Sequence, residues 1–271
     1  MGSFCRAALN FVSFDAPTAV TREVDIRDGR AAALPGWEEA GFELVDHPSA
    51  VKDWSDDDEI NAVHHAEVEA LAEAMTGCDH ALVAGHIKRG PDQARQHQDL
   101  APITFVHSDF APSYDALIRG SFRAAENPGG VRALERHGLT PEAVEGASRI
   151  VILQFWRNLG PAKMDHPITF CDARTVRFDD GKAFPVSNYA GSGFDFDALG
   201  VRAPDDPDQY HWYAFPEMRP DEAVAFRTFD TDRVREGKTF FTPHSAFRDP
   251  DVALGKPARR SIELRATCIY A

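Results

Sequence analysis

The stretch IVILQFW, residues 150–156, indicates the fold class. It is an uninterrupted, mostly apolar run rich in β-branched and aromatic side chains, which is typical of a buried strand. Further strands are predicted at residues 81–87, 103–109, 169–178, 211–215, 223–229, 238–242 and 261–270. Regular helices do not alternate with these strands, so a doubly wound parallel sheet fits poorly. The pattern predicts an α+β, mainly β chain: a β-sandwich or jelly roll supported by helices.

Helices are expected mainly in the N-terminal half. From Glu59 to Met75 the apolar residues fall close to one stripe, acidic residues precede them, and Gly77 follows as a stop. A helical insert over about residues 112–148 contains predicted helices at 114–125 and 130–137 and a helix start at Thr140-Pro141. We expect one domain over residues 1–271, with a helix-containing part at about 1–100.

Composition excludes several classes of protein. The net charge is −14 over 271 residues, which argues against a nucleic-acid partner because phosphate binding needs clustered positive charge. Charges interrupt every apolar run before the length of a membrane span, about 18 residues, and a secretory leader is not expected. The four cysteines have neither zinc-site spacing nor the density of a disulfide framework. We therefore expect a cytoplasmic protein that acts on a small molecule, and leave its oligomeric state open.

One pair of residues suggests a metal site. His107 and Asp109 are two apart at the end of a predicted strand, ITFVHSD, so their side chains leave on the same face. A further histidine from a neighbouring strand would complete a 2-His-1-carboxylate face with open positions for oxygen and a chelating cosubstrate. The best candidate is His244, which follows a short aromatic strand and Pro243. Taken alone, H-x-D is also common as a structural polar pair.

A second element lies downstream, in RRSIELR, residues 259–265. In a strand, Arg259, Ser261, Glu263 and Arg265 share one face. A guanidinium can pair bidentately with a carboxylate, and a nearby hydroxyl adds a third hydrogen bond. These groups suit the distal carboxylate of 2-oxoglutarate. The alternative is a solvated strand face on which Glu263 pairs with Arg265.

The order H-x-D, distal His, R-x-S resembles the Fe(II)/2-oxoglutarate dioxygenases. The stretches GFELVDHPSAVKDWSDDDEI, VHSDF, CDARTV, WYAFPEMRPDEAVAFRTFD, FTPHSAF and RRSIELRA are similar to the CmcJ/NvfI (AsaB-like) oxidoreductase family, from about Gly41 to the C-terminus. The resemblance implies a double-stranded β-helix core, the cofactors Fe(II), 2-oxoglutarate and O2, and a natural-product substrate. It also implies hydroxylation, desaturation or cyclisation of that substrate after hydrogen abstraction by a ferryl-oxo species.

Residue roles follow from the resemblance position by position. It makes His107, Asp109 and His244 the iron ligands and Arg259 with Ser261 the 2-oxoglutarate clamp. Arg265 is the reserve for that clamp or a substrate contact, and the Tyr213 hydroxyl is a further candidate contact to the cosubstrate, with core packing as its alternative. It leaves open whether Trp156, Arg157 or Asn158 faces the pocket, and whether His86 and Arg89 lie at its rim. We expect His64 and His65 to be surface or packing residues, and Asp172 and Arg174 to form a structural ion pair.

Two other hypotheses stand beside the oxygenase. A metal-dependent hydrolase or lyase could use the same three ligands to hold zinc and a water. It would need no keto acid, which leaves Arg259 and Ser261 without a purpose. A non-catalytic binding jelly roll would make the three positions structural.

Overall fold

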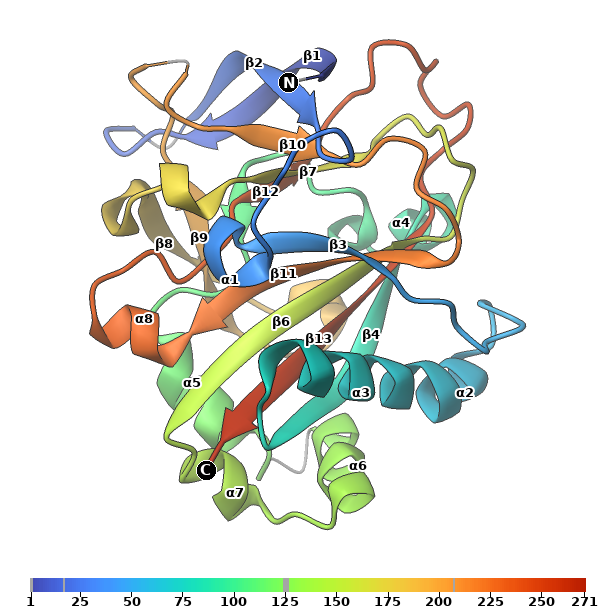
Figure 1. The fold of residues 1–271 in the computed structure, drawn as a ribbon, viewed down its shortest axis with the longest axis vertical. Helices are drawn as coiled ribbons and strands as arrows, with labels where there is room; N and C mark the ends of the chain where they lie inside the picture. Colours follow the sequence, from blue (N-terminus) through green and yellow to red (C-terminus); the bar gives the residue numbers. More distant parts are fainter. Residues whose placement is uncertain (1, 17, 124–126, 207) are drawn as a thin grey trace.

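The computed structural model describes residues 2–16, 18–123, 127–206 and 208–271. Its frame is two β-sheets (Figure 1). The order in the larger sheet is β1 (Ser3–Val12), β2 (Ala19–Asp28), β10 (Trp212–Ala214), β7 (Ile168–Cys171), β12 (His244–Ala246), β5 (His107–Ser108), β9 (Phe196–Val201) and β8 (Gly181–Val186). The order in the smaller sheet is β3 (Phe42–Asp46), β11 (Glu222–Asp230), β6 (Arg149–Asn158), β13 (Ser261–Tyr270) and β4 (His80–Arg89). The mainly β jelly-roll class is confirmed.

The predicted strand at IVILQFW forms β6, the central strand of the five-stranded sheet, between β11 and β13. Its alternate residues face opposite sides. Val151, Leu153 and Phe155 pack on the side of the sheet covered by α3 (His65–Thr76), whereas Ile150 and Ile152 join the cluster on the other side. Both faces are therefore buried, which explains why the sequence shows a nearly continuous apolar run rather than an alternating one.

The predicted N-terminal helix is confirmed. It comprises α2 (Asp57–Glu59), a π-helical turn at Ile60–His64 and α3, which lies along the five-stranded sheet (Figure 1). The Asp56 side chain accepts from the N–H groups of Asp58 and Glu59, so the acidic run is a helix start. Gly77 ends the helix at φ 64°, in the left-handed region that favours glycine.

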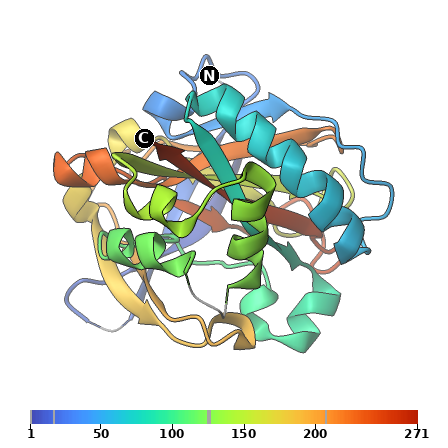
Figure 2. The ribbon, with the colours of Figure 1, turned by 90° about the horizontal axis from the view of Figure 1, so that it is seen from below.

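The helical insert forms α5 (Tyr114–Ser121), α6 (Pro128–His137) and α7 (Pro141–Glu145), which gather at one end of the sheets (Figure 2). The predicted helix at 114–125 ends earlier, at Ser121, and its residues 124 and 125 lie outside the described residues. Helix α6 packs closely on β4, because a Cβ added at Gly129 would lie 1.7 Å from the carbonyl oxygen of Ala84. The shorter helices are α1 (Trp37–Ala40), α4 (Pro91–Gln96) and α8 (Thr231–Arg235).

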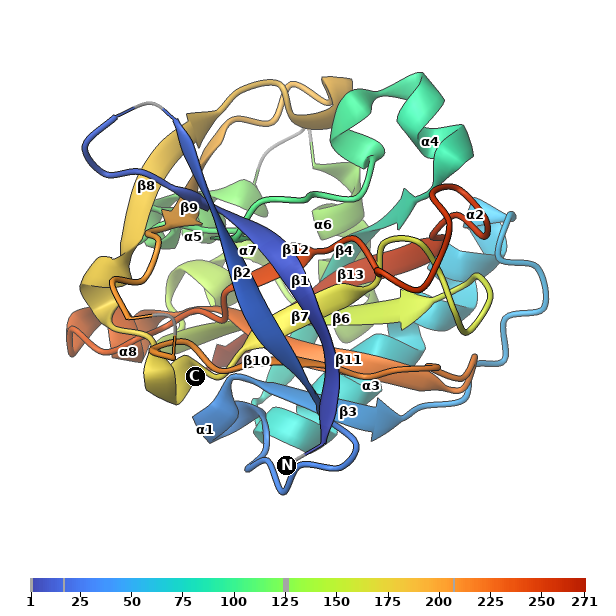
Figure 3. The ribbon, with the colours of Figure 1, turned by 90° about the horizontal axis from the view of Figure 1, so that it is seen from above.

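Several strand predictions need correction. Residues 238–242 form no strand: Phe240 and Phe241 are both buried in an irregular segment, so apolar content there reflects packing. The strand predicted at 169–178 ends at Cys171, because the Asp172 side chain accepts from the Arg174 N–H and starts a 3-10 turn. Only His107–Ser108 of the predicted strand 103–109 is ladder-paired. Strands β1, β2, β3, β8, β9 and β12 were not predicted. The β1–β2 hairpin forms one edge of the larger sheet, where β2 pairs with β10 (Figure 3).

None of the helices in the described part of the chain combines the length and the apolar character that a membrane crossing needs.

Candidate active site

The two histidines and the aspartate predicted from sequence meet at one point between the sheets. His107 in β5 and His244 in β12 are directly paired across neighbouring antiparallel strands, with ring centroids 4.3 Å apart. Asp109 follows β5, and its Oδ1 lies 3.9 Å from His107 Nε2 and 3.6 Å from His244 Nε2. All three side chains are buried. The strand spacing thus places two imidazole nitrogens and one carboxylate oxygen on a common centre, as the sequence predicted.

Backbone carbonyls orient both imidazoles. His107 Nδ1 lies 2.8 Å from the carbonyl oxygen of Phe105, and His244 Nδ1 lies 3.0 Å from that of Thr242. A carbonyl oxygen only accepts, so each Nδ1 carries a hydrogen, and Nε2 is the ring nitrogen directed to the centre. Burial, together with the neighbouring His244 ring, lowers the pKa of His107 to about 3. His107 is therefore neutral near pH 7, the form that binds metals.

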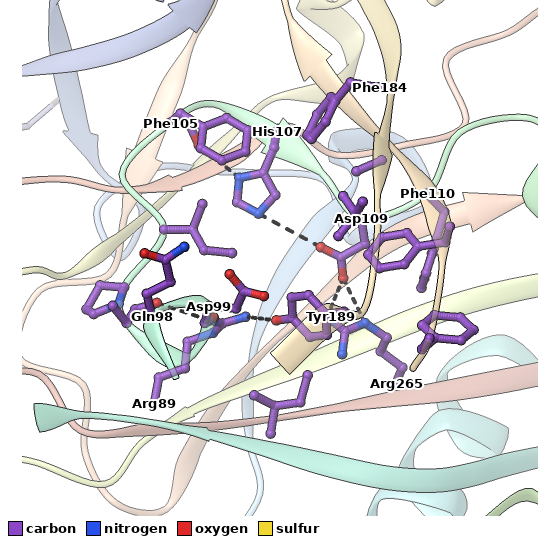
Figure 4. A pocket seen from close by; sticks show the side chains of 18 of the residues that line it. Arg89, Gln98, Asp99, Phe105, His107, Asp109, Phe110, Phe184, Tyr189 and Arg265 are labelled. Atoms are coloured by element: carbon purple, nitrogen blue, oxygen red, sulfur yellow. Dashed lines mark hydrogen bonds and ion pairs between the residues drawn. The ribbon is translucent and has the colours of Figure 1, made fainter. Parts of the chain in front are cut away.

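The second oxygen of Asp109 is held by an arginine. Arg265 in β13 donates to Oδ2 from Nε at 2.8 Å, and its Nη2 lies 2.7 Å from the same oxygen (Figure 4). Burial opposes the charge of Asp109, but the Arg265 guanidinium and His244 hold the pKa of this carboxyl well below its usual range. The carboxylate is therefore ionised, with Oδ1 directed at the imidazoles and Oδ2 occupied.

A chain of charged groups continues from Arg265 to the rim of the site. Glu263 Oε1 lies 3.5 Å from Arg265 Nη2 and 2.9 Å from Arg89 Nη2. Arg89 Nη2 also donates to the Tyr189 hydroxyl at 2.7 Å (Figure 4). Burial favours the neutral acid, but Arg89 and Arg265 lower the pKa of Glu263. The charges alternate along this chain, so Arg89 and Arg265 each have a carboxylate partner.

Arg259 has a different environment. It is 3% exposed, its Nε donates to Ser261 Oγ at 3.0 Å, and its guanidinium lies 5.0 Å from the centroid of the Trp156 ring. Neither terminal nitrogen has a hydrogen-bond partner among the residues that the structure describes. Burial, with the nearby Arg89, lowers the pKa of Arg259 to about 9. A buried cation without a carboxylate partner is costly. Arg259 also lines a cavity together with His107, Asp109 and His244, which makes it a candidate binding group for an anion at this site.

A small cavity of about 20 Å³ separates Arg259 from the two histidines and Asp109. Gln154 lines it from β6, and its Oε1 has no hydrogen-bond partner in the described part of the chain. The small cavity shares Arg89, Ile103, His107 and Asp109 with a larger one of about 550 Å³. Figure 4 shows side chains that line the larger cavity. Aromatic side chains dominate the larger cavity, among them Phe105, Phe110, Tyr114, Phe184, Tyr189 and Phe196. The site therefore has a polar inner chamber and an apolar outer one.

The structure does not bring every predicted residue to this site. Tyr213 packs in the aromatic core beside Phe42, and its hydroxyl accepts from Arg27 Nη1 at 3.3 Å. It lines neither cavity. The expectation that its hydroxyl contacts a cosubstrate is not supported, because β10 directs this side chain into the packed cluster.

The structure also places the residues whose relation to the pocket the sequence left open. Trp156 contacts Arg259, whereas Arg157 donates to the carbonyl oxygens of Pro220 and His47. Asn158 bonds the backbone of Gly160. Arg89 lines the larger cavity and His86 a neighbouring one of about 600 Å³. His64 and His65 are buried, and Asp172 with Arg174 forms an ion pair at 2.7 Å, as expected.

Sequence reasoning missed Gln154 and Tyr189. Gln154 had a signal: it is the one polar residue within IVILQFW, in a strand buried on both faces. Tyr189 had none, because it lies in the 3-10 turn Tyr189–Gly191 far along the chain and reaches Arg89 only in the folded protein.

Comparisons with known proteins agree with this geometry. A family model described as "Oxidoreductase/YMDC permease-like domain" matches residues 12–269. The chain is 25% identical over 240 residues to the alpha-ketoglutarate-dependent dioxygenase phiK of Fungal sp., covering 86% of this chain and 79% of that protein. It is 26% identical over 242 residues to the hydroxylase/desaturase CTB9 of Cercospora beticola, covering 83% of this chain and 69% of that protein.

A solved structure supports the fold. The iron and alpha-ketoglutarate-dependent endoperoxidase NvfI superimposes with a TM-score of 0.75 at 20% identity, over 99% of each chain. The resemblance to NvfI/AsaB-like oxidoreductases is confirmed by these relatives. The chain belongs to the oxidoreductase family whose model spans residues 12–269, within its NvfI/AsaB-like group.

Proposed function

We propose that this chain is an Fe(II)- and 2-oxoglutarate-dependent oxygenase whose iron ligands are His107, Asp109 and His244. One observation carries the proposal: a buried two-histidine, one-carboxylate centre faces a buried arginine with free terminal nitrogens across a small cavity. A metal hydrolase needs the first of these features but not the second. The oxygenase needs both, because its cosubstrate is a dicarboxylate that reaches the metal with one end only.

The three ligands fit ferrous iron. Two imidazole nitrogens and one carboxylate oxygen form the set typical of non-heme Fe(II) oxygenases. Each imidazole is oriented by a backbone carbonyl, and Arg265 restricts Asp109 to one free oxygen. Such outer contacts fix the ligands before the metal arrives. When bound, iron with 2-oxoglutarate and O2 supplies the oxidation of a substrate C–H bond.

Arg259 and Ser261 hold the distal carboxylate of 2-oxoglutarate. The two free guanidinium nitrogens suit a bidentate carboxylate, and the surrounding burial strengthens the ion pair by excluding water. The inner chamber of about 20 Å³ is smaller than the keto acid, so side chains must move when it binds. Gln154 is the side chain that moves, because its Oε1 gives up no hydrogen bond. The shared lining residues make the larger cavity the entry route.

Arg265 positions Asp109 and does not clamp the cosubstrate. Its Nε and Nη2 already contact Asp109 Oδ2, and Nη2 also faces Glu263. Moving it to a second carboxylate would take the buried Asp109 carboxylate away from its arginine partner, which costs several kcal/mol. We assign no role in the site to Tyr213.

The outer cavity accepts an apolar small molecule. Its aromatic lining suits a ring-containing natural product, and the position of the target bond beside His107 and Asp109 decides which carbon is oxidised. We further propose that residues 1–271 act as one domain in the cytoplasm, with neither nucleic acid nor membrane as a partner. The charge of −14 supports this proposal.

Anaerobic titration tests the function. Fe(II) and 2-oxoglutarate added together should give a weak visible charge-transfer band in the parent protein, and no band in His107→Ala. A hydrolase or a binding protein gives no band in either. If the parent shows no band and His107→Ala binds 2-oxoglutarate equally well, the oxygenase proposal fails.

A further inference from the structure

A second group of metal-binding side chains lies outside the active site. Glu73 near the end of α3, His80 at the start of β4 and His137 at the end of α6 each offer a ligand atom, and these atoms lie within 4.8 Å of one another. None of the three lines the cavities described above. We propose that this cluster is a structural site for a divalent transition-metal ion of the zinc class.

The ligand types favour such an ion. Two imidazoles and one carboxylate suit zinc, which takes four ligands and would complete its shell with water. Bonds of about 2.0 to 2.2 Å place the ligand atoms of a tetrahedral site roughly 3.5 Å apart. Side-chain rotations of half-buried residues can close the remaining gap, since Glu73, His80 and His137 are all partly exposed. A calcium or magnesium site would instead need mostly oxygen ligands.

Hydrogen bonds and ion pairs from neighbouring residues already orient two of the ligands, Glu73 and His137. The backbone N–H of Ala81 donates to Glu73 Oε1 at 3.1 Å, which holds this carboxylate beside β4. His137 Nε2 lies 3.4 Å from Glu69 Oε2, and its Nδ1 lies 3.9 Å from Glu73 Oε1. Glu69 is itself held by the Val83 N–H at 2.9 Å and by Arg136. A carboxylate behind a histidine that directs its other nitrogen to the metal is the usual outer arrangement of such sites.

The position of the cluster explains what a metal would do there. Two of its ligands come from the consecutive elements α3 and β4, and the third comes from α6, which belongs to the distant helical insert (Figure 2). Helix α6 rests on β4 through Gly129, at its N-terminal end. A metal at His137 would fasten the opposite end of the helix to α3 and β4. Because no substrate cavity reaches it, the ion would stabilise the fold and take no part in oxidation.

Metal stoichiometry separates this site from the active site. Zn²⁺ titrated by equilibrium dialysis into the metal-free full chain should bind at two equivalents in the parent, one in His107→Ala and one in His137→Ala. The double variant should bind none. Zn²⁺ should also raise the Tm of His107→Ala, and this gain should disappear in the His107→Ala/His137→Ala protein.

Matched variants keep the result interpretable. His80→Ala should also lose one equivalent, and Glu73→Gln should weaken binding by at least about 10-fold while keeping an acceptor for Ala81. His97→Ala is the control. His97 Nδ1 lies 3.4 Å from Asp99 Oδ2, and among the described residues His97 belongs to neither metal-ligand group. This variant should keep both equivalents. Circular dichroism checks that each variant folds. If folded His137→Ala and His80→Ala bind as many equivalents as the folded parent, the site does not exist. A parent that binds a single equivalent, which His107→Ala keeps and His137→Ala loses, would leave this proposal standing while the active-site proposal fails.

Discussion

The described part of the chain contains two groups of two histidines and one carboxylate, and their surroundings differ. In the first, His107, Asp109 and His244 are 6%, 8% and 4% exposed, lie beside a large cavity and face an unpaired arginine. In the second, Glu73, His80 and His137 are partly exposed on helix ends and a strand start. Ligand chemistry alone predicts metal binding for both. The cavity and the free cation give only the first group a means to hold a cosubstrate and exclude water.

Removing a ligand from the buried group should have the largest effect. His107→Ala leaves one imidazole and one carboxylate, so we expect loss of detectable Fe(II)–2-oxoglutarate absorption and a fall in succinate formation of at least about 1,000-fold. His211→Ala, a histidine outside both groups, should retain parental absorption and turnover. Absorption in folded His107→Ala equal to that of the parent would contradict the assignment of this ligand.

Removing the guanidinium of Arg259 should have the second-largest effect. Arg259→Ala should raise the 2-oxoglutarate concentration for half-saturation about 100- to 1,000-fold, because truncating a buried bidentate contact costs about 3 to 4 kcal/mol. Fe(II) affinity in the absence of keto acid should change less than about 3-fold. Arg259→Lys should recover only part of the loss, since an ammonium lacks the planar fork. An unchanged half-saturation in Arg259→Ala would remove the feature that distinguishes the two groups.

Arg265 should give a smaller and different loss. Arg265→Ala frees Asp109 Oδ2, so Fe(II) affinity should fall about 10- to 100-fold, as for other outer contacts to metal ligands. The half-saturating 2-oxoglutarate concentration, measured at saturating iron, should stay within a few-fold of the parent. The opposite pattern, with iron affinity kept and keto-acid affinity lost, would exchange the roles of Arg259 and Arg265.

The burial of His107 should make the free energy of unfolding depend on pH. Its pKa in the folded protein is lowered to about 3 by burial and His244, against about 6.5 in an unfolded chain. A lowered histidine pKa gives stability that is present above pH 6.5 and is lost as the pH falls toward the folded value. Between pH 7 and 5.5 the metal-free parent should therefore lose about 1 kcal/mol more unfolding free energy than His107→Gln. Denaturant unfolding in a chelator measures this, and equal losses would contradict it.

Local patterns account for the predictions that succeeded. Strand β6 was found because both faces are buried, and the helix over Glu59–Met75 because its stripe and caps depend on near neighbours. The predictions that failed concern segments whose state depends on distant contacts. Phe240 and Phe241 resemble a strand but fill an irregular packed segment, and β1 with β2 gave no signal strong enough to predict the hairpin.

The sequence by itself determined which residues could share a face. The i, i+2 spacing placed His107 with Asp109, and Arg259 with Ser261 and Arg265, because strand geometry is local. Only the tertiary structure decided their partners. It set His244 opposite His107, gave Arg265 to Asp109 and left Arg259 without an acid. It also placed Tyr213 in the packed core, outside the active site, and brought Glu73, His80 and His137 together. The Arg259 guanidinium is available to a ligand because none of the described carboxylates contacts it, and that depends on how distant strands pack.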